Sequence, residues 1–302
     1  LCERVPKVPI NKAAARVSYL RSTVLESNSW SVDLPMNHCS QTIPRPNSLI
    51  LAAHGSRCGR AAKALKLMAS RLAKQDLFEQ VLTTYHQGQP RFPQILEMIS
   101  GNSAVVVPVF LSEGYYSKQV LPQQLRQARG LASMKIWITP VVGTDFRLQE
   151  ALLKRVKKII QRFRWTPERT TVVVLGHGTP RSKSSTLTTQ KAADFLSCQG
   201  ACEIVHSAFI DEAPSPRAVL EGSNSNHCVV LPFFFGGGEH VDELAQLLEL
   251  KVSQLGDSAA IAGRDIQGLE YFIDRPIGED PVMVEIIKNL AQSFHLWVPL
   301  DF

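Results

Sequence analysis

The chain has 302 residues, 44% of them hydrophobic, and a formal net charge of +6 at pH 7. This length allows two ordinary domains or one domain built twice, and so modest a charge suits an acidic small molecule as readily as a nucleic acid. No apolar run reaches the roughly 18–20 residues of a membrane span, and the six cysteines form no CxxC pair and no regular framework. Because the chain also begins without a secretory apolar region, we expect reduced thiols, a cytoplasmic location and no membrane partner.

The first 47 residues show no clean helical or strand period and contain five prolines. We expect residues 1–47 to form a poorly ordered N-terminal extension, because they offer no periodic apolar face that could dock on a core. Position 1 is Leu, so Met36 is an alternative start. The sequence alone does not choose between the two.

Strands and helices alternate from residue 48 to residue 165. Buried apolar runs predict strands, and apolar residues at helical spacing predict helices. The expected strands are 49–53, 81–85, 104–111 and 136–138, and the expected helices are 61–74, 90–99, 121–131 and 146–163. The basic residues of the last helix are interpreted as a solvated face; they are Lys154, Arg155, Lys157, Lys158 and Arg162. This alternation predicts a parallel sheet covered by helices on both faces.

The pattern restarts after a linker at 165–169 and fills residues 170–302. The expected strands are 171–175, 204–209, 229–235 and 259–262. The expected helices are 185–198, 216–220, one that ends near residue 255, and 282–291.

The two stretches are copies of one domain. His54 and His177 lie 123 residues apart, each directly after the first strand of its copy. Asp145 and Asp280, which precede the last helices, lie 135 apart, and this predicts an insertion after the third strand of the second copy. A period above 100 residues indicates a duplicated domain rather than a solenoid. We therefore expect an α/β fold of two halves, each a four-stranded parallel sheet with helices on both faces.

Polar side chains of the second copy gather where its strands end. His177 follows the first strand, Asp211 and Glu212 follow the second, and His240 follows the third, beyond three glycines at 236–238. The carboxyl ends of parallel strands meet at the edge where open α/β sheets bind ligands. Two imidazoles and a carboxylate there can hold a divalent metal with positions left open, or exchange protons near neutral pH. A helix cap explains either acid alone, but not the convergence of all three groups.

The first copy retains only part of this arrangement. His54 occupies the first position, whereas Gln87 and Tyr116 stand where the acid and the second histidine are expected. Glutamine is a poor metal ligand and no base, and a phenol with a pKa near 10 is mostly protonated at neutral pH. We therefore predict that the first site is degenerate and that the second is intact.

Taken in order, these motifs resemble those of the sirohydrochlorin chelatases, the class II chelatases of the cobalamin and siroheme pathways. The shared features span residues 48–295, in both copies. They are a strand–HG[ST]–helix start, a Phe-x-Asp/Glu…Pro second strand, a Pro–apolar–Gly-x-His third strand and a Pro-x-Gly-x-Asp lead-in to the last helix. The resemblance implies two flavodoxin-like halves facing a central cleft, in which a tetrapyrrole polycarboxylate receives cobalt or iron without ATP.

Carried over to this chain, the resemblance makes His177, His240 and Asp211 the catalytic and metal-binding residues. The family usually has Glu at the acid position, so Glu212 is an alternative ligand. The glycines after the third strand would let the macrocycle approach, and further substrate contacts are implied from neighbouring positions. The substrate-binding candidates are Gly237, Gly238, His54, Arg57, Arg181 and Arg264.

The preferred function is therefore insertion of Co²⁺, with Fe²⁺ next, into sirohydrochlorin by a lyase-type chelatase that needs no cofactor beyond the substrate metal. The alternative from another class is a non-catalytic metal or tetrapyrrole carrier on the same fold. A nucleotide-binding flavodoxin-like protein is disfavoured, because HGSR and HGTP are not glycine-rich phosphate loops. We expect no nucleic-acid partner, and the sequence gives neither the oligomeric state nor a choice of metal.

Overall fold

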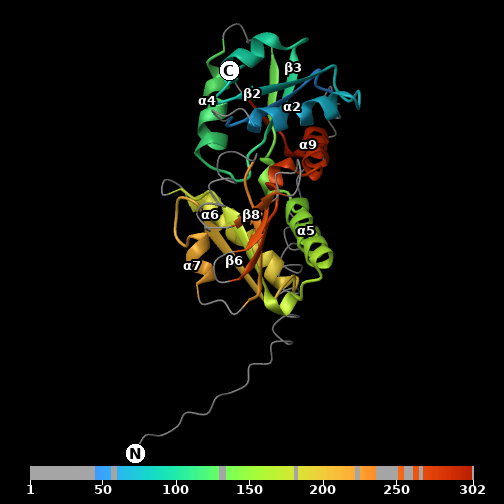
Figure 1. The fold of residues 1–302 in the computed structure, drawn as a ribbon. Coiled ribbons are helices and arrows are strands. Elements are labelled where there is room, and N and C mark those ends of the chain that lie inside the picture. The colour runs from blue at the N-terminus through green and yellow to red at the C-terminus, as the bar shows by residue number, and fades with distance from the viewer. Residues whose placement is uncertain are drawn as a thin grey trace, which may run out of the picture. The chain divides into compact units, whose positions relative to one another are not determined.

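The structure is a computed structural model that describes residues 45–55, 60–128, 134–179, 183–221, 225–235, 251–254, 261–264 and 268–300 (Figure 1). The expected N-terminal extension, 1–47, lies almost wholly outside these residues, so its looseness stays a prediction. Within the described ranges, no helix is both long and apolar enough to cross a membrane.

The first half forms a parallel sheet from four strands in the order β2-β1-β3-β4. These strands are β1 (Ser48–Ala53), β2 (Gln80–Tyr85), β3 (Ser103–Pro108) and β4 (Lys135–Ile138). Its helices are α2 (Arg60–Ala73), α3 (Phe92–Ile95), α4 (Leu121–Arg126) and α5 (Arg147–Phe163). The short helical turns are η1 (Leu96–Met98), η2 (Tyr116–Val120), which is a π-helical turn, and η3 (Val142–Thr144).

The second half repeats this topology, with four parallel strands in the order β6-β5-β7-β10. These strands are β5 (Thr170–Gly176), β6 (Ile204–Phe209), β7 (His227–Pro232) and β10 (Glu270–Ile273). The described helices are α6 (Lys183–Cys198), α7 (Pro216–Leu220) and α9 (Val282–Gln292), with the short turns η4 (Pro167–Arg169), η5 (Ile277–Glu279) and η6 (Phe294–Leu296). The identical strand order confirms the predicted duplication.

Both sheets extend beyond their four parallel strands by antiparallel additions. The strand β11 (Val298–Pro299) pairs with β4, and β8 (Lys251–Gln254) and β9 (Ile261–Arg264) continue the second sheet beyond β10. The β8–β9 pair is the predicted insertion between the third strand and the last helix.

Two predictions in this region are wrong. The helix expected to end near residue 255 gives way to β8 by Lys251, and the expected fourth strand at 259–262 overlaps β9, which is antiparallel. The true fourth strand is β10, which is only four residues long and lacks the long apolar run of the other central strands. The part of the expected helix before residue 251 lies outside the described residues.

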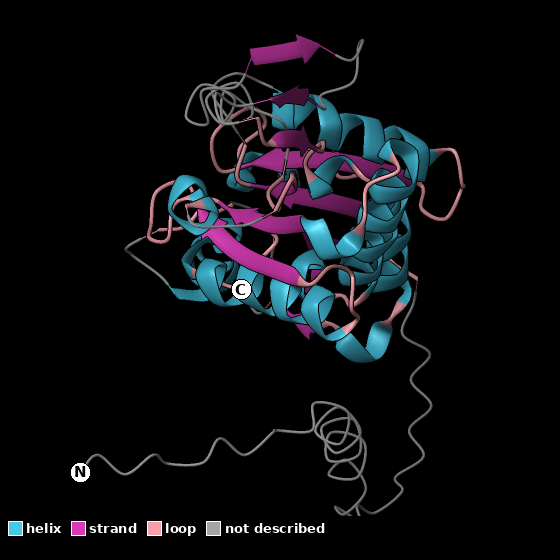
Figure 2. Ribbon diagram, turned by 60° about the horizontal axis from the view of Figure 1, so that its bottom comes forward, coloured by secondary structure: helices cyan, strands magenta, loops and turns pink. Residues whose placement is uncertain are grey.

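The central strands are buried on both faces, because alternate side chains enter different cores. In β1, Leu49 and Leu51 belong to one cluster and Ile50 and Ala52 to another, as the two-residue period of a strand requires. The first of these clusters also contains Val172 and other second-half residues, whereas the outer faces of the two sheets have separate clusters. Helices accordingly flank the strands on both sides (Figure 2). The two halves thus share one hydrophobic core.

The last helix of each half packs on the sheet of the other half. Helix α5, from the first half, contacts β7 and α6, whereas α9, from the second half, contacts β3 and α2 (Figure 1). The apolar face of α9 buries Met283, Ile286, Ile287 and Leu290, each at most 6% exposed. At about 1.5–3 kcal/mol per buried side chain, these four contribute an upper estimate of roughly 6–12 kcal/mol to the association of α9 with the first half.

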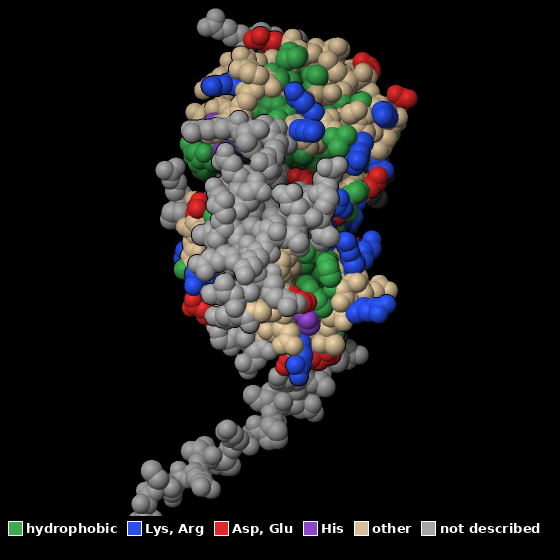
Figure 3. Space-filling model, viewed as in Figure 1, with side chains coloured by type: hydrophobic (Ala, Val, Ile, Leu, Met, Phe, Trp, Pro, Cys, Tyr) green, Lys and Arg blue, Asp and Glu red, His purple; other side chains and the backbone are tan. Residues whose placement is uncertain are grey.

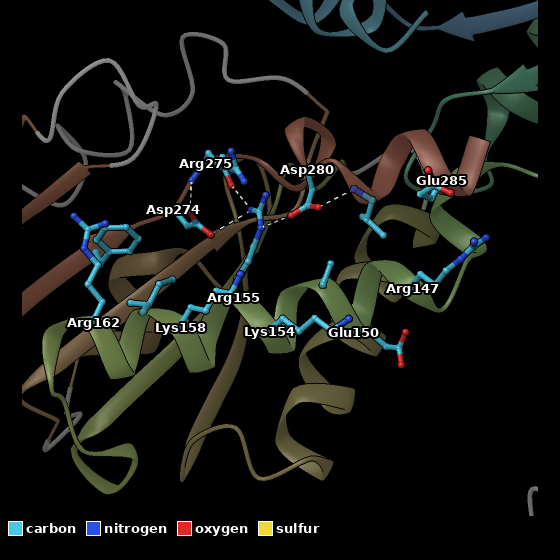
Figure 4. A pocket seen from close by; sticks show the side chains of 14 residues that line it. Arg147, Glu150, Lys154, Arg155, Lys158, Arg162, Asp274, Arg275, Asp280 and Glu285 are labelled. Atoms are coloured by element: carbon cyan, nitrogen blue, oxygen red, sulfur yellow. Dashed lines mark hydrogen bonds and ion pairs between the residues drawn. The ribbon is translucent and has the colours of Figure 1, made fainter. Parts of the chain in front are cut away.

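Arg155 on α5 stabilises this exchange of helices between the halves through polar contacts with second-half residues. Its guanidinium lies 2.8 Å from Asp280 Oδ2 and 3.2 Å from Asp274 Oδ2, and it donates a 2.7 Å hydrogen bond to the carbonyl of Arg275 (Figure 4). Arg155 is 9% exposed, so its expected place on a solvated face is wrong. Asp280 also accepts a hydrogen bond from the backbone N–H of Val282 and so caps α9. Asp145 does the same for the Arg147 N–H at the start of α5, which explains why both copies carry Asp at this point.

Candidate active site

The two His–Gly turns have the same backbone construction. Gly55 and Gly178 have φ of +81° and +74°, where a side chain is strained. A Cβ on Gly55 would collide with the carbonyl of Gln87, and one on Gly178 would lie 2.9 Å from the Cβ of Glu212. Glycine after each histidine therefore lets the loop that follows the second strand close onto the turn.

Backbone hydrogen bonds fix that closure. The N–H of Gln87 donates to the carbonyl of His54 at 2.8 Å, and the N–H of Asp211 donates to the carbonyl of His177 at 2.9 Å. Gln87 and Asp211 are thus equivalent, as the sequence comparison predicts. In each half the backbone at this position is held against the backbone of the histidine.

In the second half this construction brings a carboxylate to an imidazole. His177 Nδ1 lies 3.1 Å from Asp211 Oδ2 and 3.2 Å from the carbonyl of Gly178, and the two side chains are 45% and 54% exposed. Acceptors at Nδ1 favour the tautomer with its proton on that atom, which makes Nε2 the basic nitrogen. The pair can therefore present a metal-ligating or proton-accepting atom while Asp211 holds the ring.

Glu212 is engaged elsewhere. Its Oε2 accepts a 2.7 Å hydrogen bond from the hydroxyl of Thr186 on α6 and a 3.4 Å hydrogen bond from the backbone N–H of Thr179. These contacts tie the His–Gly turn to the first turns of α6. The geometry favours Asp211 over Glu212 as the acid that acts with His177.

The first half holds a second imidazole that the sequence reasoning missed. The ring of His86 lies 5.4 Å from that of His54, and Tyr116 lies 4.6 Å from His54 and 5.0 Å from His86, all between ring centres. His86 directly precedes Gln87, so matching positions between the copies passes it over. The signal that could have found it is a histidine at the carboxyl end of β2, the edge predicted to bind ligands.

His54 and His177 line the same cavity, which has a volume of about 150 Å³ and takes walls from both halves. Its other walls are mainly apolar, from the ends of β3 and β7 and the residues after them, including Val109 and Phe233. Burial lowers the pKa of His54, and the neighbouring His86 and His177 lower it further, so this imidazole is neutral at pH 7. The cavity is smaller than the roughly 300–1,000 Å³ of small-molecule pockets, and a hydrated ion fits it better than a macrocycle.

Several predicted site residues lie outside the described residues. These are His240, Gly237, Gly238, Arg57 and Arg181, so their place in the site stays a prediction. Arg264 lies in β9, where its backbone pairs with Glu270. Among the described residues, no group of three or more His, Cys, Asp or Glu is placed to hold a metal ion. The three-residue metal site proposed from sequence is therefore untested.

A wider groove of about 630 Å³ runs along α5, where Lys and Arg side chains gather (Figure 3, Figure 4). Its lining is of mixed charge, with cations from Arg147, Lys154, Arg155, Lys158, Arg162 and Arg275 and acids from Glu150, Asp274, Asp280 and Glu285. Two of these acids are committed to Arg155. None of the side chains that line this groove is an imidazole or a thiol. The smaller cavity, which His54 and His177 line, is therefore the better candidate for binding a metal ion.

Two equivalent α/β halves that bring one histidine each to a shared cavity define a duplicated, chelatase-like protein. The model of the CbiX family matches residues 48–159 and, a second time, residues 171–293. The chain therefore belongs to the CbiX family and carries its domain twice.

Curated relatives agree with this assignment. A protein of Halobacterium salinarum named "Probable sirohydrochlorin cobaltochelatase" is 25% identical over 218 residues, which is 65% of this chain and 74% of that protein. A "Sirohydrochlorin cobaltochelatase" of Sulfurisphaera tokodaii is 27% identical over 117 residues, which is 37% of this chain but 93% of that protein. The second relative is thus about the length of one half.

Solved structures support the fold. A Deinococcus radiodurans multi-domain protein, described as structurally similar to chelatases, matches with a TM-score of 0.64 and 24% identity over 82% of this chain and 55% of that one. SirB from Bacillus subtilis, solved with Fe³⁺, matches with a TM-score of 0.62 and 16% identity over 82% of this chain and 94% of that one. At these identities the likeness concerns the fold alone.

Proposed function

We propose that this protein inserts a divalent metal, Co²⁺ first and Fe²⁺ next, into sirohydrochlorin without ATP. Membership of the CbiX family supports the reaction class, and the two cobaltochelatase relatives support the substrate and the choice of cobalt. The solved SirB with Fe³⁺ keeps iron as the runner-up. The observation that carries the proposal is the His177–Asp211 pair, at a cavity shared with His54.

The chemistry requires groups that can hold a metal and accept protons. Insertion removes two pyrrole N–H protons while the metal loses its water ligands. A neutral imidazole can serve both steps, because its nitrogen lone pair binds either a metal or a proton. Asp211 lies at Nδ1 of His177 and holds the ring with Nε2 free to bind the metal or to accept a pyrrole proton.

The remaining family positions complete the proposal. His240 would be the second imidazole and Gly237 and Gly238 the close approach for the macrocycle, with Arg57 and Arg181 toward the substrate's carboxylates. These five assignments rest on the family's motifs in the sequence. The proposal invokes no cofactor beyond the metal that is inserted.

The test is the absorbance change when the purified full chain is mixed with sirohydrochlorin and Co²⁺, repeated with Fe²⁺ and Ni²⁺. The rate without protein is subtracted. We expect His177→Ala to lower the insertion rate at least about 100-fold, and Asp211→Asn to lower it about 10- to 100-fold, as the loss of a histidine's outer partner does elsewhere. Glu212→Gln is the matched control and should change the rate less than about threefold, since its carboxylate contacts threonine and backbone donors rather than an imidazole.

Two outcomes would contradict the proposal. A wild-type rate no higher than the protein-free rate, with tight binding of metal or tetrapyrrole, would make the protein a carrier. An inactive His54→Ala beside an active His177→Ala would move the chemistry to the first half.

A further inference from the structure

The first half carries a cluster of polar aromatic side chains that the proposed reaction does not use. His54, His86 and Tyr116 pack mutually, and each comes from a different segment at the carboxyl edge of the first sheet. Tyr116 opens the π-helical turn η2, a rare backbone form that is frequent at functional sites. Three converging segments and an unusual backbone indicate that this edge is built for more than packing.

The spacing of the two imidazoles matches a shared metal ligand set. A metal–nitrogen bond of about 2.1 Å, plus roughly 1.2 Å from nitrogen to ring centre, puts a bound metal about 3.3 Å from each centre. Two imidazoles at bond angles of roughly 100–120° then have centres about 5 to 6 Å apart. The centres of His54 and His86 are 5.4 Å apart, with the rings tilted by 50°.

The nitrogen atoms are suited to the same purpose. Nδ1 of His54 lies 3.2 Å from the carbonyl of Gly55, which holds the proton on that atom and gives Nε2 the lone pair. Nδ1 of His86 is buried, and in the part of the chain that the structure describes it has no hydrogen-bond partner. A buried ring nitrogen without a partner is costly, and a metal ion would satisfy it.

We propose that His54 and His86 form a second divalent-metal site in the first half, with Tyr116 closing its third side. Imidazole ligands suit first-row transition metals such as Co²⁺, Fe²⁺, Ni²⁺ and Zn²⁺. Two imidazoles complemented by water hold such an ion more loosely than three protein ligands do. The site is therefore a holding site, from which the ion can leave.

The position of the site gives it a role that rests on the proposed function. His54 also lines the cavity that His177 lines, so an ion released by His54 and His86 enters the cavity beside the second-half pair. The first half then supplies metal to the second half. With Gln87 and Tyr116 at the two other positions, the site of the first half stores metal and does not insert it.

The test measures metal binding apart from insertion. The purified full chain, freed of metal by a chelator and dialysed, is titrated with Co²⁺ by calorimetry and by visible absorption. We expect two Co²⁺ ions per chain. His86→Phe, which keeps a ring against Phe92 and Tyr116 but removes both nitrogens, should lose one ion, and His177→Ala should weaken the other at least tenfold. His206→Phe, in the middle of β6, is the matched control and should keep both ions.

Insertion kinetics supply the second readout. The His86→Phe protein should show a several-fold higher KM for Co²⁺ with kcat unchanged, because the holding site matters only when metal is scarce. Circular dichroism of each variant establishes that it is folded.

Two results would overturn the proposal. The first is wild-type stoichiometry and affinity in His86→Phe, and the second is a single Co²⁺ ion that His86→Phe and His177→Ala both remove, which would make one site shared between the halves. Failure of the proposed function is distinguishable from these. A chain that inserts no metal yet loses one Co²⁺ on His86→Phe refutes chelation and retains the holding site.

Discussion

Replacing Arg155 by methionine tests whether the helix exchange holds the two halves together. The substitution keeps most of the side chain's apolar stem but removes the guanidinium that contacts Asp274, Asp280 and the carbonyl of Arg275. Both carboxylates then stay behind in a site where they are only 13% and 15% exposed. The variant is therefore expected to unfold more easily, mainly because two largely buried carboxylates lose the cation that they contact.

The magnitude follows from that burial. Removing one partner of a buried ion pair costs about 3–5 kcal/mol, far more than the 0–1 kcal/mol of a surface pair. A domain of this size loses roughly 2–4 °C in melting temperature per kcal/mol, so the expected fall is about 6–20 °C. The triple variant Arg155→Met, Asp274→Asn, Asp280→Asn should regain about half of the loss. It removes the stranded charges, and asparagine caps a helix as well as aspartate does.

The assay is urea unfolding followed by circular dichroism, with melting curves as a second measure. Lys158→Met, an exposed change one turn further along α5, is the control and should stay within about 0.5 kcal/mol of wild type. A loss below about 1 kcal/mol for Arg155→Met, or no recovery in the triple variant, would refute the electrostatic reasoning. Separate transitions for the two halves in the wild-type protein would refute the shared core.

Two further predictions concern the His–Gly turn and the partly buried His227. Gly178→Ala should destabilise the fold by about 1–3 kcal/mol and slow metal insertion, because its Cβ at φ +74° would press on Glu212 and Phe209 and move Asp211 from His177. Gly200→Ala is the matched control, since Gly200 has a φ of +63° but no atom within 4 Å of an added Cβ. Equal effects of the two substitutions on the insertion rate would contradict this account. Burial lowers the pKa of His227 from 6.5, so the unfolded chain binds more protons, and stability should fall as pH drops below about 6.5. His227→Gln should lessen that fall when urea midpoints at pH 7.5 and 5 are compared, and an unchanged pH dependence would count against the assignment.

The sequence predicted two parallel sheets of the same topology and a His–Gly turn in each, because these features depend on local pattern. A buried apolar run such as Thr171–Leu175 is best explained as a central strand. His54 and His177 each follow the first strand of a copy, and this repeated pattern indicates the same topology twice. The insertion was also visible, as a change in spacing before Asp280. The β8–β9 pair itself was not predicted, because leucines at helical spacing just before it indicated a helix that continues to about residue 255.

Long-range placement could not be predicted in the same way. An amphipathic pattern states which face of α5 is apolar, but not which sheet that face covers, so the helix exchange left no local signal. Arg155 falls on the apolar stripe of α5, between Leu152 and Ile159, and that position was the available sign of its burial. The sequence left Asp211 and Glu212 as alternatives, since both follow β6. The contact of Asp211 with His177, and the contacts of Glu212 with Thr186 and Thr179, separate the two.

The exchanged helices also bear on ancestry. A chain of one half would have a last helix with no sheet of its own to cover, and a second identical chain would supply that sheet in return. Such a pair would be a symmetric dimer, in which any substitution appears at both sites at once. When the two copies are joined in one polypeptide, a substitution affects one site only. The exchanged helices still hold the two halves together. A difference between the halves, such as Gln87 where the second half has Asp211, can then arise in one half with the other unchanged.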